Sequence, residues 1–317
     1  MESTPSETLP KALRGIRWKK LGCIWETIPT YSWMQSHSAN PVAEVLGNGD
    51  VRVYFSCRDQ YNISSIASIE FNVANPQQSF LVSEEPVLGP GPIGAFDDNG
   101  ASMGCLVHAH GKRYLYYLGW NLGVTVPWRN SIGLAISNGP NLPFEKISLA
   151  PVLDRSDTDP FSISYPWILW DEDSDRWQMW YGSNLKWGPE QRDMAHTLKY
   201  AESDDGIHWK PTGDLITPLH EPLEYAQSKP CVVKDSDGYR LWFSFRGERY
   251  RIGYAESSDG RHWERLDEYS GIDVSPEGWD STMVCYPNVF SWDGKLYMLY
   301  NGNAYGKTGI GLAVQQD

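Results

Sequence analysis

The sequence predicts an all-β protein, a five-bladed β-propeller in which the N-terminal segment closes the ring against blade five. Two observations carry this prediction. Three kinds of strand-like segment recur five times in a fixed order, and the 317 residues include 15 Trp and 18 Tyr. Recurrence in a fixed order indicates a repeat architecture, and strands favour aromatic and β-branched side chains.

The first recurring segment is an apolar run that ends in a polar turn. Four copies begin with a proline, at Pro41, Pro166, Pro230 and Pro287, and the second copy begins at Ser102 without one. An aromatic-rich segment follows each turn, at residues 51–56, 114–119, 177–182, 239–244 and 296–301. Two such runs joined by a short turn containing Gly are typical of a β-hairpin.

The third recurring segment is a strand of small residues, which aligns on Ala67, Ala135, Ala201, Ala255 and Ala313. In blades three and four it continues into the similar stretches 203–209 and 257–263, each of the form Ser-x-Asp-Gly-x-His-Trp. We interpret these stretches as hairpin turns that deliver a packing Trp to the outer strand, in preference to a binding motif.

Blade five ends at Val314 without a fourth strand, and an open edge invites aggregation. The segment 16–24 has the composition of the missing outer strand, so we expect it to close the ring there. Neither half of such a ring can close alone. We therefore expect one domain over residues 1–317, with residues 1–13 flexible.

The formal charge of −13 and the pI near 5.0 argue against nucleic acid and anionic membranes as partners. The N-terminus lacks the features of a signal peptide, and no run of 18 apolar residues occurs. We expect a cytoplasmic protein. The five cysteines are widely spaced, with no CxxC pair, which favours small core thiols in a reducing compartment over a zinc site. We expect no cofactor and no metal.

In a propeller the innermost strands line the central channel, and ligands meet the loops at its mouth. Polar residues precede each innermost strand at His37, Asn40, Asp97, Asp98, Ser102, Tyr165, Glu224, Lys229, Asp280 and Tyr286. Further candidates end the second strands at Arg58, Asp59, Trp120, Trp187 and Arg246. His37 is the one histidine that we expect in the pocket.

Four of these residues, Asp97, Asp98, Glu224 and Asp280, are candidates for catalysis. Carboxylates that share a pocket acquire different pKa values, so that one can act as an acid and another as a base, and glycoside hydrolysis uses such a pair. Alternatively, some of them cap loops or pair with Arg58, Arg246 or Lys229. We expect Asp157, Asp159 and Glu277 to be turn residues, and His108 and His110 to be surface groups.

The other candidates are predicted to bind substrate. An Arg fork can hold a carboxylate or neighbouring hydroxyls, which suits Arg58 and Arg246. Trp120 and Trp187 either stack on a sugar face or pack within their loops. His37, Asn40, Asp59, Ser102, Tyr165, Lys229 and Tyr286 complete the predicted binding set.

The chain resembles the superfamily of five-bladed propeller glycosidases that includes glycoside hydrolase families 32, 43, 68, 117 and 130. The resemblance runs from Trp18 to Val314 and rests on the blade pattern, the Asp-Gly turns and the polar groups before the inner-strand prolines. It looks closest to a branch with the motifs Phe96-Asp-Asp-x-Gly100, Tyr200-Ala-Glu-Ser-Asp-Asp-Gly206 and Trp279-Asp-Ser-x-Met283. It implies a glycosidase or glycoside phosphorylase that acts on a saccharide.

The sequence departs from the family pattern at Asn40. Families 32 and 43 carry an Asp before the first inner-strand proline, as nucleophile or base, and an amide cannot serve as that base. Glu224 is the nearest counterpart of the family 43 acid, although the family's Glu-Gly-Pro sequence is not present.

Three functional hypotheses remain. The first is a glycoside-active enzyme in which Asp97 or Asp98 works with Glu224 and Asp280 binds or tunes. The second is a non-catalytic carbohydrate-binding propeller, which Asn40 supports. The third is a pocket used for other acid–base chemistry, such as cyclisation or isomerisation, on a small-molecule substrate. The oligomeric state is left open.

Overall fold

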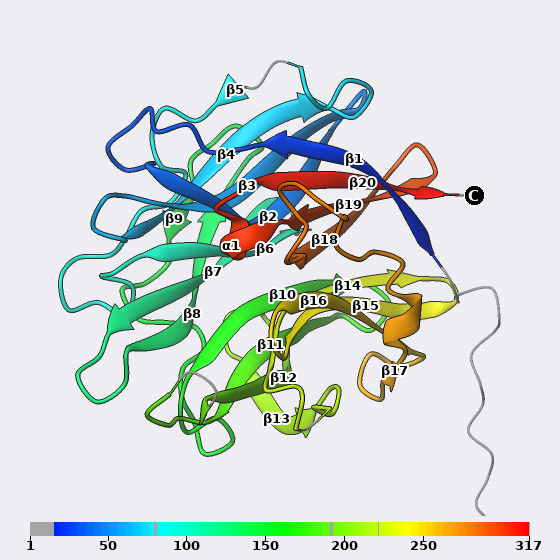
Figure 1. Ribbon diagram of the computed structural model, residues 1–317. Helices are drawn as coiled ribbons and strands as arrows, with labels where there is room; N and C mark the ends of the chain where they lie inside the picture. Colours follow the sequence, from blue (N-terminus) through cyan, green and yellow to red (C-terminus); the bar gives the residue numbers. More distant parts are fainter. Residues whose placement is uncertain (1–15, 79–80, 191–192, 221, 317) are drawn as a thin grey trace, which may run out of the picture.

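The computed structural model describes residues 16–78, 81–190, 193–220 and 222–316 (Figure 1). The segment that we expected to be flexible, residues 1–13, lies outside the described residues. The described chain forms five antiparallel blades around a common axis, which confirms the predicted propeller. None of its helical segments is long and apolar enough to cross a bilayer.

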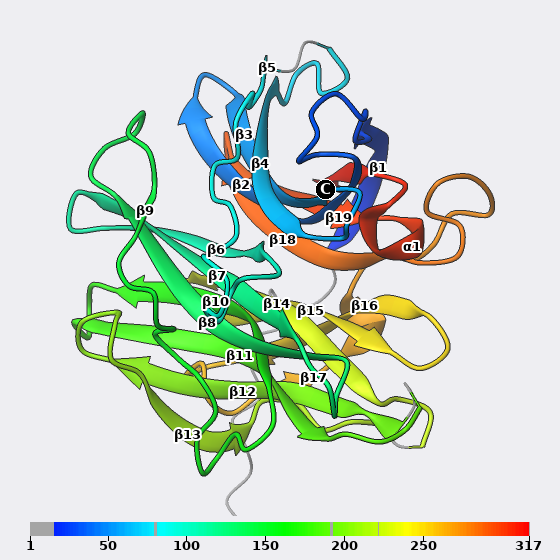
Figure 2. The ribbon, with the colours of Figure 1, turned by 90° about the vertical axis from the view of Figure 1, so that its left-hand side faces the viewer.

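Each blade contains four strands, in order from the axis outward. Blades 1 and 2 are formed by β2 (Ser36–Gly47), β3 (Asp50–Arg58), β4 (Ser64–Asn72) and β5 (Leu81–Val82), and by β6 (Ala101–Ala109), β7 (Lys112–Leu122), β8 (Trp128–Ser137) and β9 (Glu145–Lys146). Blades 3 and 4 are formed by β10 (Ile163–Asp171), β11 (Arg176–Lys186), β12 (Ala195–Ser203) and β13 (Lys210–Leu215), and by β14 (Ala226–Asp235), β15 (Gly238–Arg246), β16 (Tyr250–Ser257) and β17 (Glu264–Arg265). Blade 5 is formed by β18 (Cys285–Trp292), β19 (Lys295–Asn301), β20 (Ile310–Gln316) and the N-terminal strand β1 (Arg17–Trp25). A short 3-10 turn, η3 (Asp267–Tyr269), follows β17, and the short turn α1 (Asn303–Gly306) joins β19 to β20. In Figure 2 the strands of blade 2 lie between blades 1 and 3.

The N-terminal strand closes the ring, as the sequence predicted. Strand β1 pairs antiparallel with β20, from Arg17 opposite Gln316 to Trp25 opposite Ile310 (Figure 1). The start of this strand also reaches blade 4, because the Trp18 indole donates to the Ser270 carbonyl at 3.1 Å. The same indole packs edge-on against Trp242, with the ring centres 6.0 Å apart. The two ends of the chain are therefore fastened by one strand.

All five innermost strands contain an irregularity at the same point, where four of them carry the predicted X-Pro step. The register shifts between Ala39 and Val42, Met103 and Cys105, Ser164 and Trp167, Ser228 and Cys231, and Cys285 and Asn288. Asn40, Lys229 and Tyr286 adopt positive φ angles of 56°, 51° and 56° there. Because a bulge re-aims the side chains around it, this repeated irregularity turns polar groups toward the axis.

Short side chains connect neighbouring blades close to the axis. The hydroxyl oxygens of Ser56 and Ser244 accept hydrogen bonds from the next blade's innermost strand, at 2.8 and 2.7 Å. Two thiols do the same: Cys105 accepts from the Ile168 amide at 3.4 Å, and Cys231 accepts from the Val289 amide at 3.1 Å. All five cysteines are free thiols, and the four in strands β3, β6, β14 and β18 are buried, as expected of core residues.

The two Asp-Gly turns connect blades at the outer end. Asp205 accepts hydrogen bonds from the Ile207 and His208 amides, both at 2.8 Å, which shapes the turn. The Gly206 carbonyl then accepts the Tyr116 hydroxyl of blade 2 at 2.7 Å, and Gly260 accepts the Trp180 indole in the same way at 2.8 Å. The structural interpretation of these stretches is confirmed.

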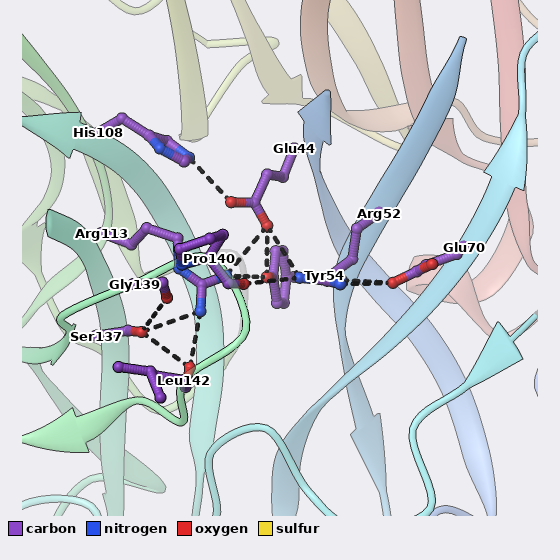
Figure 3. Close-up of polar contacts among 10 residues, drawn as sticks. All are labelled: Glu44, Arg52, Tyr54, Glu70, His108, Arg113, Ser137, Gly139, Pro140 and Leu142. Atoms are coloured by element: carbon purple, nitrogen blue, oxygen red, sulfur yellow. Dashed lines mark hydrogen bonds and ion pairs between the residues drawn. The ribbon is translucent and has the colours of Figure 1, made fainter. Parts of the chain in front are cut away.

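A charged network joins blades 1 and 2 (Figure 3). Glu44, whose side chain is 4 % exposed, approaches Arg52 at 3.5 Å, Arg113 at 3.3 Å and His108 at 3.0 Å. The Tyr54 hydroxyl donates to the same carboxylate at 2.7 Å. His108 is exposed, as predicted, but its ring contacts a buried acid from the neighbouring blade.

Candidate functional site

A cavity of about 350 Å³ lies at the axis and receives side chains from all five blades. Its walls are rich in aromatic rings and cations: Trp120, Trp128, Tyr165, Tyr225, Tyr250, Tyr286, Tyr305, Arg58, Arg246 and His196. Small polar residues complete them: Asn62, Ser64, Ser102, Asn130, Ser164, Asn184 and Ser228. No Asp or Glu is among the described residues that line it. This size is in the range of small-molecule pockets.

Six of the predicted substrate-binding residues line this cavity. They are Arg58, Ser102, Trp120, Tyr165, Arg246 and Tyr286. The structure places the other predicted residues elsewhere: His37, Asn40, Asp59, Trp187, Lys229 and the four carboxylates Asp97, Asp98, Glu224 and Asp280 do not line it.

Arg246, at the end of β15, is surrounded by tyrosine rings. Its guanidinium carbon lies 5.6 Å from the Tyr225 ring centre, 5.5 Å from Tyr250 and 5.6 Å from Tyr305. The Nε atom is buried without a hydrogen-bond partner. Cation–π contacts of this kind hold a guanidinium in place without neutralising it, so the charge is retained at the cavity wall.

Arg58, at the end of β3, supplies the second cation. Its guanidinium donates to the Asn62 side-chain oxygen at 2.7 Å, and Asn62 also lines the cavity. Within the described chain, no carboxylate lies within ion-pair distance of Arg58. Asp59, the next residue, instead accepts the Tyr61 and Ile63 amides at 2.8 and 2.9 Å and holds the β3–β4 turn.

Two histidines close to these cations stay neutral at physiological pH. Burial and the neighbouring Arg246 lower the pKa of His196 to about 4. Burial, Arg58 and Lys307 lower the pKa of His37 to about 4. His196 lines the cavity and His37 does not, which reverses the expectation from the sequence.

Asn40 lies just behind the lining, in contact with a residue that belongs to it. Its amide nitrogen donates to the Tyr165 hydroxyl at 3.3 Å and to Ser56 at 3.4 Å. Its amide oxygen is buried without a hydrogen-bond partner. Burial raises the pKa of Tyr165, so this phenol stays protonated. Asn40 therefore orients a cavity tyrosine.

Lys229 is fully buried on the axis, away from the cavity lining. Its ammonium donates to the Gly104 carbonyl at 2.6 Å and lies 5.9 Å from the Trp167 ring centre. Burial lowers the pKa of Lys229 to about 8. These contacts join the innermost strands of blades 2, 3 and 4, so the residue acts at the centre of the scaffold.

Asp97 and Asp280 occupy equivalent places in blades 2 and 5, and both are 1 % exposed. Asp97 accepts the Tyr117 hydroxyl at 3.1 Å and pairs with Lys146 at 2.6 Å. Asp280 accepts the Tyr300 hydroxyl at 3.1 Å and pairs with Lys20 of β1 at 2.7 Å. Both carboxylates are thus committed to partners outside the cavity.

Blade 3 repeats this arrangement with Asp159, which the sequence suggested was a turn residue. Asp159 is 1 % exposed, accepts the Tyr181 hydroxyl at 2.8 Å and pairs with Lys199 at 3.1 Å. Recurrence of one Asp–Tyr–Lys unit in three blades favours a role in the scaffold.

Glu224 and Asp98 are also held by neighbours outside the cavity lining. Glu224 is 3 % exposed, pairs with Arg265 at 2.8 Å and accepts the Gln227 amide at 2.9 Å. Asp98 accepts the Asn121 amide at 2.7 Å and the Gly94 amide at 2.9 Å. Asn121 directly follows Trp120, which lines the cavity, so Asp98 is hydrogen-bonded next to the cavity wall.

The two predicted tryptophans have different positions. Trp120 lines the cavity, and its indole donates to Ser64 at 2.8 Å, which fixes the ring. Trp187 stands edge-on to Trp128 with the ring centres 5.4 Å apart. Trp128 lines the cavity, so Trp187 supports the aromatic wall from behind.

A third set of lining residues, which begin or precede the third strands, was missed from the sequence. Aligned on the repeated alanine, the residue five positions earlier is Asn62, Asn130, His196 and Tyr250 in blades 1 to 4, and all four line the cavity. The signal was present in the repeat. Among the described residues, no group of three or more His, Cys, Asp or Glu could hold a metal ion.

Sequence relatives identify the family of this chain, although no family model matches it. The Mycobacterium tuberculosis protein MT1551 (strain CDC 1551 / Oshkosh) is 46 % identical over 300 residues, which cover 95 % of this chain and 99 % of that protein. Rv1502 of M. tuberculosis strain H37Rv is 45 % identical over the same shares. The chain belongs to the family of these two uncharacterized proteins.

Solved structures show the same fold at low sequence identity. A glycosyl hydrolase from Bacteroides ovatus has a TM-score of 0.71 and 17 % identity, covering 97 % of this chain and 95 % of its own. A member of the GH130 family of mannoside phosphorylases and hydrolases has a TM-score of 0.68 and 16 % identity, over 98 % and 95 %. A family-43 glycoside hydrolase has a TM-score of 0.64 and 17 % identity, over 92 % of each chain. The protein has the fold of the propeller glycosidases, as the resemblance implied.

Proposed function

We propose that this protein is a carbohydrate-binding propeller whose saccharide ligand occupies the central cavity. One observation carries the proposal: the cavity wall holds two tryptophans and five tyrosines around a space of about 350 Å³, without a carboxylate among its described residues. Aromatic faces bind the apolar face of a sugar ring, and hydroxyl and amide groups bind its edges. The shared fold with glycoside hydrolases supports the same class of ligand.

The geometry also explains why binding is preferred to hydrolysis. Glycoside hydrolysis by the usual mechanism needs two carboxyl groups that flank the scissile bond. Asp97, Glu224 and Asp280 are each at most 3 % exposed and already paired with a cation. A carboxylate that is committed to such a pair is a poor proton donor for a ligand on the other side of the wall.

Binding is tested by calorimetry with a panel of mono- and disaccharides. The wild-type protein is expected to bind at least one of them, and Trp128→Ala is expected to weaken that binding about 5- to 10-fold through loss of ring contact. Trp170→Ala is the matched control, because Trp170 lies at the far end of β10 against His110 and Trp177. Equal affinity in both variants, or no binding by the wild type, would contradict the proposal.

A glycoside-active enzyme is the second candidate, favoured by the fold and by Asp98. This carboxylate contacts Asn121 beside Trp120 and pairs with no cation in the described chain. If the protein turns over a bound saccharide, release of reducing sugar is expected to fall by about 100-fold or more in Asp98→Asn, while binding persists. Saccharide binding without product in the wild type excludes this candidate.

The five free thiols support a reducing compartment. We accordingly propose a cytoplasmic location, which fractionation of the native cells tests.

A further inference from the structure

We propose that the saccharide held in the cavity is acidic, and that Arg246 binds its carboxylate or phosphate group. This inference rests on the proposed carbohydrate-binding function and adds the class of ligand. Arg246 and Arg58 both line the cavity, so a ligand of sugar size can contact either guanidinium.

Arg246 and Arg58 lack an acidic partner in the described chain, unlike four other arginines of the strands. Arg52, Arg113, Arg240 and Arg265 are each paired with a protein carboxylate, on Glu70, Glu44, Asp235 and Glu224 respectively. Arg246 forms no ion pair with any described residue, and its Nε is buried without a hydrogen-bond partner. The side chain of Arg246 is half-buried, so water solvates its charge incompletely, and an anionic ligand supplies a partner for it.

The guanidinium of Arg246 is also preorganised for an anion. Three tyrosine rings at 5.5 to 5.6 Å surround it without using its hydrogen-bond donors. A guanidinium presents five N–H donors in a fixed fork that matches carboxylate and phosphate oxygens. Because the rings fix the position of Arg246, little side-chain entropy is lost when the fork binds an anion.

The charge at the cavity is opposite in sign to the charge of the whole chain. The chain carries 40 acidic and 27 basic residues, yet none of the described lining residues is acidic and two are arginines. Burial lowers the pKa values of His196 and His37 to about 4, with a further contribution from the positive charges of Arg246, Arg58 and Lys307. A neutral sugar gains nothing from these charges, whereas an acidic sugar does.

Hydrogen-bond donors surround the same space. The Asn184 amide nitrogen is buried without a partner in a residue that lines the cavity and is 7 % exposed. Burial raises the pKa of Tyr250 and Tyr286, so both phenols remain protonated and can donate. The unpartnered Asn184 amide nitrogen, with these hydroxyls beside it, favours a ligand rich in oxygen acceptors, as a carboxylate or phosphate is.

The test compares matched ligands by calorimetry. The probes are the methyl glycosides of glucose, galactose and mannose, the methyl glycosides of the corresponding uronic acids, the three hexose 6-phosphates, and inorganic phosphate alone. The wild-type protein is expected to bind at least one acidic probe about 10- to 100-fold more tightly than its neutral counterpart, the range given by charge-assisted hydrogen bonds. Uronic acids and hexose phosphates separate the two possible sources of the anion.

Variants assign the effect to Arg246. Arg246→Gln is expected to lose about 10-fold or more in affinity for the acidic probe relative to its change in affinity for the neutral one. Arg176→Gln is the control. It removes an exposed arginine at the start of β11, the end away from the cavity residue Asn184, and is expected to bind both probes as the wild type does. If Arg246→Gln loses its native circular dichroism spectrum, the test uses Arg246→Lys instead. The lysine ammonium cannot make the bidentate contact of a guanidinium, so we expect the affinity for acidic probes to fall about 5-fold or more relative to that for neutral probes.

The outcomes separate this inference from the function beneath it. A wild-type protein that binds neutral and acidic sugars equally overturns the inference and leaves carbohydrate binding intact. Unchanged affinity of Arg246→Gln for the acidic probe also overturns it. Inorganic phosphate that binds as tightly as every hexose phosphate shows that the anion does not need a sugar, which overturns it too. If no probe binds, both proposals fail.

Discussion

The Tyr300 hydroxyl donates a hydrogen bond to the Asp280 carboxylate at 3.1 Å, inside blade 5. Lys20, from the strand that closes the ring, pairs with the same oxygen at 2.7 Å. Asp280 thus connects the two ends of the chain. The corresponding pairs are Tyr117–Asp97 in blade 2 and Tyr181–Asp159 in blade 3.

Asp280→Asn is therefore expected to lower stability. Removal of one partner from a buried ion pair costs about 3 kcal/mol or more, and Tyr300→Phe is expected to cost about 1 kcal/mol. Urea unfolding at pH 7 measures both. Asp98→Asn is the matched carboxylate control, with a smaller expected loss because Asp98 forms no ion pair in the described chain. A stable Asp280→Asn protein that no longer binds or converts a saccharide would restore the catalytic role predicted from sequence.

We propose that residues 1–317 fold as one domain, because β1 near the N-terminus pairs with β20 near the C-terminus. A substitution at Gly271 tests this proposal. Gly271 has a φ of +72°, and a β-carbon there would lie 1.8 Å from the Ile16 carbonyl oxygen. Gly271→Ala is expected to displace β1, lower the melting temperature and speed amide exchange in residues 17–25. Gly294 has nearly the same φ, +73°, with nothing within 4 Å of such a β-carbon.

Gly294→Ala is the control for backbone strain alone, worth about 1 kcal/mol. Gly271→Ala is expected to exceed this loss and to keep a single unfolding transition. Equal melting temperatures for the two variants would show that the contact with β1 contributes nothing.

The Glu44 network predicts a pH-dependent contribution to stability (Figure 3). Hydrogen bonds from His108 and Tyr54 and the charge of Arg113 outweigh burial and lower the pKa of Glu44. Its stabilising effect is therefore complete above the unfolded pKa of about 4.3 and is lost as pH falls through the lower folded value. Glu44→Gln is expected to cost about 3 kcal/mol at pH 7, with a smaller difference from wild type at acidic pH.

The comparison is urea unfolding at neutral pH and near pH 3, with the exposed Glu85→Gln as control. A gap between Glu44→Gln and wild type that stays constant over this range would mean that the charge of Glu44 is unimportant.

His196 predicts a linkage of the same sign in a higher pH range, because its folded pKa of about 4 lies below the ordinary value of 6.5. The unfolded chain takes up a proton that the folded chain refuses, so stability decreases as pH falls from about 6.5 toward 4. His196→Gln is expected to reduce this slope by up to about 1.4 kcal/mol per pH unit. Unfolding free energies across this range measure it, and parallel curves for variant and wild type would contradict it.

Much of the fold was predictable because it depends on local patterns. Strand alternation, Gly-containing turns and the repeated alanine are read within a few residues of the chain, and they indicated the blades and the closing strand β1. The two Asp-Gly turns were interpreted correctly for the same reason, since Asp205 and Asp259 bond to amides two and three positions away.

The site was less predictable, because the repeat specifies where a residue lies along a strand and not which partner it meets. Asp97, Glu224 and Asp280 stand at the expected blade positions, yet Lys146, Arg265 and Lys20 from distant segments hold them. His196 stands at a repeat position shared with Asn62, Asn130 and Tyr250, but its lowered pKa depends on burial and on the approach of Arg246 from blade 4.

The number of blades, their order and the strand that closes the ring thus follow from the amino-acid sequence alone, since each depends on short-range periodicity. Six cavity residues, among them Arg58 and Arg246, followed from the same repeat. Which charges are neutralised depends instead on the folded arrangement of the chain. Ion pairing depends on side chains that meet across strands and blades, and it left three of the four candidate carboxylates buried in pairs while Arg246 faces the cavity without one.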